Sequence, residues 1–145
     1  MTLLEAPSVT ELSHVITQVT APAFLLGAVA SFTSVLIARM NRIIDRSQAL
    51  HAIGEDEASR AHLKTDIPRL KRRAVLLNRS ILFSTFAAIT TSVLVIVAFA
   101  CAYLNVAHEY GVGLLFILAL AFFTAGLVNL ARETRIALHD FDHYW

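Results

Sequence analysis

Three long runs without a charged residue are the feature that most constrains this chain. No Asp, Glu, Lys or Arg occurs in the 27 residues between Glu11 and Arg39, the 29 between Arg79 and Glu109, or the 22 between Glu109 and Arg132. A helix that crosses about 30 Å of hydrocarbon needs about 20 mostly apolar residues. Each run is long enough for one crossing, so the sequence predicts three transmembrane helices.

The composition also favours a membrane protein over a soluble helical bundle. Hydrophobic residues make up 57% of the chain and charged residues 16%, and the mean hydropathy is +0.64. A soluble domain of this size buries only about 70% of the surface of its unfolded chain, which is too little to hide so much apolar area. The single cysteine, Cys101, excludes a disulfide scaffold. We therefore expect an all-α fold.

The charge-free runs divide the chain into seven segments. We predict an outer amphipathic segment (1–20), a first transmembrane helix (21–38), a cytoplasmic helical hairpin (39–79), a second transmembrane helix (80–104), an outer turn (105–111), a third transmembrane helix (112–131) and a cytoplasmic tail (132–145). The first transmembrane helix is placed at Ala21 because Thr20 can cap it and Pro22 suits a first helical turn. Alternatively, the helical pattern of residues 8–19 continues into this helix with a kink at Pro22.

The basic residues predict the orientation. All 12 Lys and Arg residues fall between Arg39 and Arg79 or after the third run, whereas the opposite side carries only Glu5, Glu11 and Glu109. Short loops rich in Lys and Arg stay in the cytoplasm. We therefore expect a multi-pass protein with its N-terminus outside and its C-terminus inside.

Two apolar seams follow the arms of the predicted hairpin. The seams are Leu36, Met40, Ile43, Ser47 and Leu50 on the first arm, and Leu63, Ile67, Leu70, Ala74, Leu77 and Ile81 on the second. Spacings of three and four are typical of coiled coils, and we expect a break at Gly54 and another near Asp66 and Pro68. Such short seams are marginal in water, so they favour a homo-oligomer; the alternative is a hairpin that packs only on itself.

Small residues form a narrow face on each of the first two transmembrane helices. The first face consists of Gly27, Ser31, Ser34 and Ala38, and the second of Ser84, Ala88, Thr91, Ala98 and Ala102. Small residues let helix backbones approach closely in a membrane. The faces suit contacts between chains, a pore lining, or contacts between these two helices of one chain.

Polar residues gather where the hairpin meets the membrane. One predicted cluster contains Asn41, Arg42, Asp45, Asn78 and Arg79. In it Asp45 can pair with Arg79 or Arg42 as a structural clamp, or an oligomer can repeat the cluster as an ion-selecting ring at an inner pore mouth. The predicted contacts with anionic lipid headgroups are Arg39, Arg46, Lys71, Arg72 and Arg73. Nucleic acid is not an expected partner, since interleaved aromatic residues are missing.

Catalytic and metal-binding patterns are weak. The sequence contains no nucleophile elbow, phosphate loop or H-E-x-x-H motif, and the charge-free runs hold no ionisable pair for catalysis. His139 and His143 could share a helix face, but no third ligand on a rigid element is evident. We predict no catalytic residue, no metal site and no cofactor.

Four sequence motifs stand out along the chain: Pro22-Ala-Phe-Leu-Leu-Gly27, Arg39-Met-Asn-Arg-Ile-Ile-Asp-Arg46, Arg72-Arg-Ala-Val-Leu-Leu-Asn-Arg79 and Arg132-Glu-Thr-Arg135. Together they resemble an uncharacterised bacterial family of small three-span membrane proteins with a domain of unknown function. The resemblance covers about residues 9–138 and leaves out 140–145. It implies a bacterial inner-membrane location and a helical hairpin, and it brings no activity, substrate or cofactor.

Two functions from different classes remain open. We expect a non-enzymatic, self-associating inner-membrane protein whose oligomer forms an ion channel, because three helices from one chain cannot enclose a pore. The alternative is a membrane-anchored interaction module whose charged hairpin binds a partner protein or anionic lipid.

Overall fold

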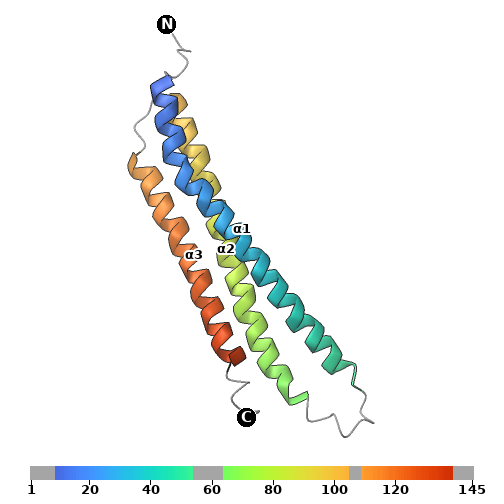
Figure 1. The fold of residues 1–145 in the computed structure, drawn as a ribbon. Helices are drawn as coiled ribbons and strands as arrows, with labels where there is room; N and C mark the ends of the chain where they lie inside the picture. Colours follow the sequence, from blue (N-terminus) through green and yellow to red (C-terminus); the bar gives the residue numbers. More distant parts are fainter. Residues whose placement is uncertain (1–8, 54–63, 105–108, 139–145) are drawn as a thin grey trace. The chain divides into compact units, whose positions relative to one another are not determined.

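The chain forms three α-helices. The computed structural model describes residues 9–53, 64–104 and 109–138, without the side chains at positions 11, 12, 15 and 109. The helices are α1 (Val9–His51), α2 (Ile67–Leu104) and α3 (Glu109–Leu138), and the described residues contain no strand (Figure 1). This confirms the expected all-α fold.

All three helices are long and apolar enough to cross a membrane. The shortest, α3, has 30 residues, which at about 1.5 Å per residue gives about 45 Å and exceeds the hydrocarbon thickness of about 30 Å. The 43 residues of α1 give about 65 Å. Each helix can therefore cross the bilayer and continue beyond it.

The first helix begins earlier than predicted. It is unbroken from Val9 to His51 with Pro22 in its interior, which favours the continuous alternative over a separate segment of residues 1–20. Thr20 does not cap a helix, because its hydroxyl donates to the Ile16 carbonyl inside α1. Proline removes one backbone donor and strains one turn, and a long apolar helix in a membrane tolerates that loss.

Other boundaries also differ in detail. Helix α3 begins at Glu109, inside the predicted 105–111 turn, and extends to Leu138, into the predicted tail. Helix α2 begins at Ile67 after a single 3₁₀ turn, with Pro68 in its first turn, where a missing N–H is tolerated. The predicted break at Gly54, residues 105–108 and the two histidines of the tail, His139 and His143, lie outside the described residues.

The chain divides into two compact units, each built from parts of all three helices. The charged unit comprises residues 32–53, 64–83 and 124–138, and the apolar unit comprises residues 9–31, 84–104 and 109–123. Every Lys and Arg of the described residues belongs to the charged unit.

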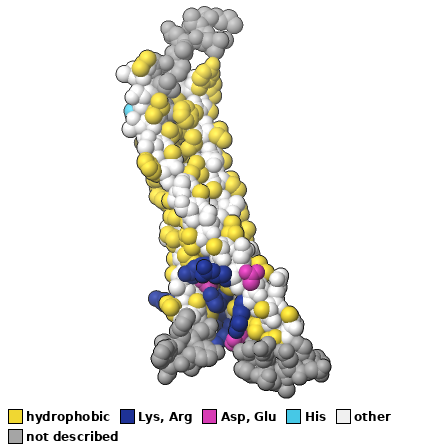
Figure 2. All heavy atoms as spheres, turned by 45° about the vertical axis from the view of Figure 1, so that its right-hand side comes forward, with side chains coloured by type: hydrophobic (Ala, Val, Ile, Leu, Met, Phe, Trp, Pro, Cys, Tyr) yellow, Lys and Arg dark blue, Asp and Glu magenta, His cyan; other side chains and the backbone are white. Residues whose placement is uncertain are grey.

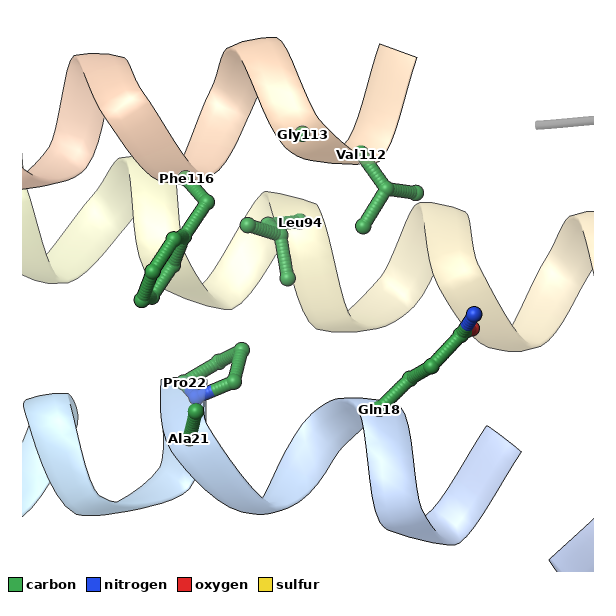
Figure 3. A pocket seen from close by; sticks show the side chains of 7 residues that line it. All are labelled: Gln18, Ala21, Pro22, Leu94, Val112, Gly113 and Phe116. Atoms are coloured by element: carbon green, nitrogen blue, oxygen red, sulfur yellow. The ribbon is translucent and has the colours of Figure 1, made fainter. Parts of the chain in front are cut away.

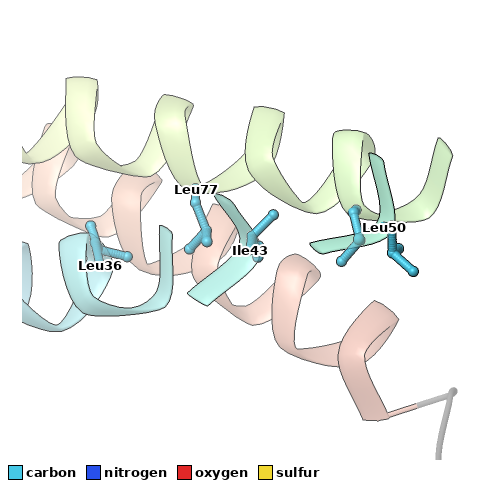
Figure 4. Packing of buried hydrophobic residues seen from close by; sticks show 5 residues of the cluster. Leu36, Ile43, Leu50 and Leu77 are labelled. Atoms are coloured by element: carbon cyan, nitrogen blue, oxygen red, sulfur yellow. The ribbon is translucent and has the colours of Figure 1, made fainter. Parts of the chain in front are cut away.

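A leucine-rich seam between α1 and α2 forms the core of the charged unit (Figure 4). Its buried members are Leu36, Ile43 and Leu50 of α1 and Leu70 and Leu77 of α2, each at most 9% exposed. Partly buried residues of both predicted seams complete it, namely Met40, Ile67, Ala74 and Ile81. The heptad prediction is confirmed, and the seam closes within one chain, so it does not by itself require a second copy.

Smaller side chains make the core of the apolar unit. Leu25 and Val29 of α1 pack with Ala87 of α2 and Ala119 of α3. The predicted small-residue face of α2 is used here, since Ser84, Thr91 and Ala98 are fully buried within the chain. The Phe86 and Phe122 rings lie with their centroids 5.6 Å apart. Close helix contact through small residues is the packing mode expected where lipid removes the hydrophobic drive between helices.

Large apolar side chains also cover much of the surface. Phe24 is 77% exposed, Ile96 67% and Leu114 68%, each on a different helix. A soluble monomer rarely exposes apolar patches on this scale, whereas lipid solvates them. The surface therefore agrees with the membrane assignment made from helix length and composition.

Candidate functional site

A buried carboxylate links the three helices of the charged unit. Glu133 of α3 is fully buried. Arg39 Nη1 of α1 lies 2.7 Å from its Oε2, and Arg73 of α2 places Nε and Nη2 each 2.8 Å from its Oε1. Arg39 Nη1 also donates to Thr134 Oγ1 at 3.0 Å. We call Glu133, Arg39 and Arg73 the carboxylate clamp.

The clamp satisfies a group that could not otherwise stay buried. A carboxylate out of water carries a large desolvation penalty unless charged, well-aligned donors surround it. All three donor contacts to its two oxygens come from guanidinium N–H groups, and charge-assisted bonds of this kind are the stronger class. The clamp therefore fixes how α1, α2 and α3 meet in this unit.

A close approach of α3 to α2 supports the clamp. The buried Ser80 hydroxyl donates to the Gly126 carbonyl. A Cβ at Gly126 would lie 3.3 Å from Phe32 Cε1 and 3.4 Å from the Ser80 carbonyl oxygen, which is tighter than ordinary van der Waals contact. Glycine at this position lets the two backbones approach before α3 reaches Glu133.

A basic groove lies between α2 and α3 of the charged unit. Figure 2 shows Lys and Arg side chains, in dark blue, gathered in one region of the visible face. The groove has a volume of 510 Å³ and is lined by four arginines and three aliphatic residues: Arg72, Arg79, Arg132, Arg135, Val75, Leu76 and Ile136. We call it the arginine groove.

An apolar cavity lies in the other unit, between all three helices. Its volume is 380 Å³, and Figure 3 shows its lining residues, which are Gln18, Ala21, Pro22, Leu94, Val112, Gly113 and Phe116. Pro22 has no N–H to donate to the Gln18 carbonyl, so this turn of α1 lacks one helical hydrogen bond beside the cavity. Gln18 is the one polar side chain among the described lining residues, which offer mainly apolar contacts.

The predicted pore or packing face of α1 is exposed on the protein surface. Gly27, Ser31, Ser34 and Ala38 are all exposed, and a Cβ at Gly27 would meet nothing within 4 Å. This face differs from the small-residue face of α2, in which Ser84, Thr91 and Ala98 are buried within the chain.

The predicted polar cluster does not form the expected ion pair. Asn41, Arg42, Asp45, Asn78 and Arg79 are all exposed, and across the described ranges Asp45 pairs with neither Arg79 nor Arg42. Asp45 follows the buried Ile43 by two residues, which places it about 200° around the helix from the α2 contact. The acidic partner in this region is Glu133.

Two predicted lipid-contact residues have a protein partner. Arg39 and Arg73 hold Glu133, whereas Arg46, Lys71 and Arg72 are exposed. Sequence reasoning missed Glu133 as a site residue. A signal was present, because Glu133 stands two residues beyond the end of a 22-residue charge-free run, but only the fold shows that both arginines reach it.

Fold and site together define a membrane protein of three transmembrane helices with a charged unit organised around a buried carboxylate. The chain belongs to the family described as protein of unknown function (DUF2721), which it matches over residues 19–143. The match starts later and ends later than the resemblance over residues 9–138 suggested. No curated protein and no solved structure matches the chain.

Proposed function

We propose that this is a non-enzymatic membrane protein that works as a homo-oligomer, with α1 as the contact between copies. The exposed small-residue face of α1 carries the proposal. Gly27, Ser31, Ser34 and Ala38 are accessible in the single chain, whereas three of the five residues of the small-residue face of α2 are already buried within it. A face that permits close helix contact and is exposed on the single chain suits a second copy.

The same face continues into the polar cluster. Asn41 and Asp45 follow Ala38 at spacings of three and four and are also exposed, so one stripe of α1 carries small residues and then polar ones. Around an oligomer axis this stripe would line an ion path with a charged mouth. Ion conduction is thus the activity we propose for the oligomer, in a bacterial inner membrane with the basic residues on the cytoplasmic side.

A matched pair of substitutions tests the oligomer. Ala38→Leu adds bulk on the proposed face, and Ala121→Leu adds the same bulk at an exposed position of α3. We expect a larger mass than one chain for the unmodified protein in nanodiscs, a shift toward monomer for Ala38→Leu, and no shift for Ala121→Leu. A strict monomer in mild detergent and in nanodiscs would remove both the oligomer and the channel.

Single-channel recording tests conduction separately. The reconstituted oligomer should conduct ions. Ser34→Leu should reduce the conductance because the larger side chain narrows the proposed ion path. An intact oligomer that shows no conductance under varied voltage, tension and ion composition would contradict the channel and leave the assembly standing.

A second candidate is a membrane-anchored module whose charged unit binds a partner protein or anionic lipid. The arginine groove favours it, since four cations around one concavity suit an anionic ligand. Such a module needs neither an oligomer nor a pore.

A further inference from the structure

We propose that the arginine groove binds the phosphate of an anionic lipid headgroup. The site is complete within one chain, so it does not depend on self-association, and it gives the membrane-anchored alternative a specific ligand. Its guanidinium groups come from two helices: Arg72 and Arg79 from α2, and Arg132 and Arg135 from α3.

The charge around the groove is unbalanced. Of the seven lining residues that the structure describes, four are arginines and none is acidic. The nearest acidic residue along the chain, Glu133, is fully buried. Its negative charge is paired with Arg39 and Arg73 inside the protein. Four like charges around one concavity repel one another, and a bound anion relieves that repulsion. Guanidinium groups also match the geometry of phosphate oxygens in pairs.

The position of the arginines favours a lipid over a soluble anion. Arg79 is the last charged residue before the second charge-free run, and Arg132 is the first after the third run. Both therefore stand where the transmembrane stretches of α2 and α3 meet polar surroundings, which is the depth of lipid headgroups.

The aliphatic residues of the groove support the same choice. Val75, Leu76 and Ile136 line it beside the arginines, and a soluble phosphate would gain nothing from them. A phospholipid places glycerol and acyl carbons next to its phosphate, so it can use both kinds of lining. The groove volume of 510 Å³ falls within the range of about 300–1,000 Å³ typical of small-molecule sites.

The groove shares one residue with the lipid contacts predicted from the sequence. Of those five basic residues near the membrane, only Arg72 lines the groove. From the sequence, Arg79 was placed in the polar cluster and Arg132 and Arg135 in no site. These arginines come together only because α3 approaches α2 in the fold.

Native mass spectrometry of the full chain tests the proposal. The protein is released from detergent with phosphatidylglycerol or phosphatidylcholine, and the bound lipids are counted per chain. We expect retention of phosphatidylglycerol, and a loss of about 25-fold in its affinity for Arg132→Gln/Arg135→Gln, because each basic residue near anionic headgroups contributes about fivefold. Arg42→Gln/Arg46→Gln removes the same charge from exposed positions of α1 and should lower the affinity by only about threefold, as expected for screened, more distant charges.

Further arms separate the alternatives. Arg132→Lys/Arg135→Lys keeps the charge and loses the paired donors, so it should fall between wild type and the glutamine variant, and it serves if the glutamine variant does not fold. Equal losses from the groove and α1 variants, or equal retention of both lipids, would overturn the proposal. Binding of inorganic phosphate as tight as that of phosphatidylglycerol would show a soluble-anion site instead.

Discussion

The charged and apolar units use opposite means to hold the same three helices. The charged unit packs large leucines in a heptad seam and joins its helices through the carboxylate clamp. The apolar unit packs alanines against Leu25 and Val29, and the hydroxyls of Thr91 and Ser92 bond to carbonyls of their own helix. Burial of large apolar side chains stabilises helix contacts when the side chains would otherwise be exposed to water. Close packing of small residues stabilises helix contacts when the side chains would otherwise be exposed to lipid.

This contrast predicts that substitutions which remove side-chain atoms destabilise the charged unit, and that substitutions which add side-chain atoms destabilise the apolar unit. The clamp should show the largest effect. Arg73→Met should lower the free energy of unfolding by about 3 kcal/mol, because it leaves the buried Glu133 carboxylate with Arg39 alone. Unfolding by SDS in mixed micelles measures the change.

Lys71→Met is the matched control for the clamp. Lys71 lies on the same helix and is exposed, so its replacement should change stability by at most about 0.5 kcal/mol. Similar losses for Arg73→Met and Lys71→Met would mean that the clamp does not hold the charged unit together.

The leucine seam should be nearly as sensitive. Leu77→Ala should lower the free energy of unfolding by about 3 kcal/mol, since Leu77 is fully buried and its loss leaves a cavity. Leu82, on the same helix, is 49% exposed, and Leu82→Ala should have a smaller effect in the same SDS titration. The seam assignment fails if Leu82→Ala is the more damaging change.

The apolar unit should respond to added bulk instead. Ala87→Leu should destabilise by about 2 kcal/mol, because Ala87 is fully buried where α2 meets Leu25, Val29 and Ala119. Ala100→Leu makes the same change at an exposed position of α2 and should be close to neutral. A neutral Ala87→Leu would show that close fit does not hold this unit.

The smallest changes in stability are expected at two buried serines of α2, Ser80 and Ser84, and the two substitutions should differ from each other. Ser80→Ala removes the buried hydrogen bond to the Gly126 carbonyl in the charged unit and should destabilise by about 1 kcal/mol. The buried Ser84 hydroxyl of the apolar unit has no hydrogen-bond partner among the described residues, so Ser84→Ala should be neutral or slightly stabilising. Thermal unfolding in detergent should resolve the pair, and the reverse order would contradict these assignments.

The sequence predicts what depends on local pattern. Charge-free runs indicate the three helices, and heptad spacing indicates that Leu36, Ile43 and Leu50 meet Leu70 and Leu77, as the core shows. Both signals are periodic or compositional, and both survive small errors in helix boundaries.

Features that depend on the third helix could not be predicted in the same way. Asp45 looked like the partner of Arg79 because both lie on the hairpin, whereas the buried carboxylate belongs to α3, 94 residues from Arg39. The start of the first helix was also predicted too late. Pro22 is compatible with a first helical turn in the local sequence, but it lies inside α1. A contact between distant segments requires the fold itself, and so does the arginine groove.

The central claim is that the charge-free stretches of the three helices lie in the hydrocarbon while the helix ends that carry the basic residues lie outside it. Cysteine labelling tests this in proteoliposomes, with Cys101→Ala as background and one new cysteine at Gln48 of α1 or at Leu118 of α3, both exposed on the protein surface. The vesicles are made permeable to a polar maleimide without dissolving the bilayer. Gln48→Cys should react rapidly and Leu118→Cys only after solubilisation. Equal reaction of the two cysteines in intact bilayers would contradict the account.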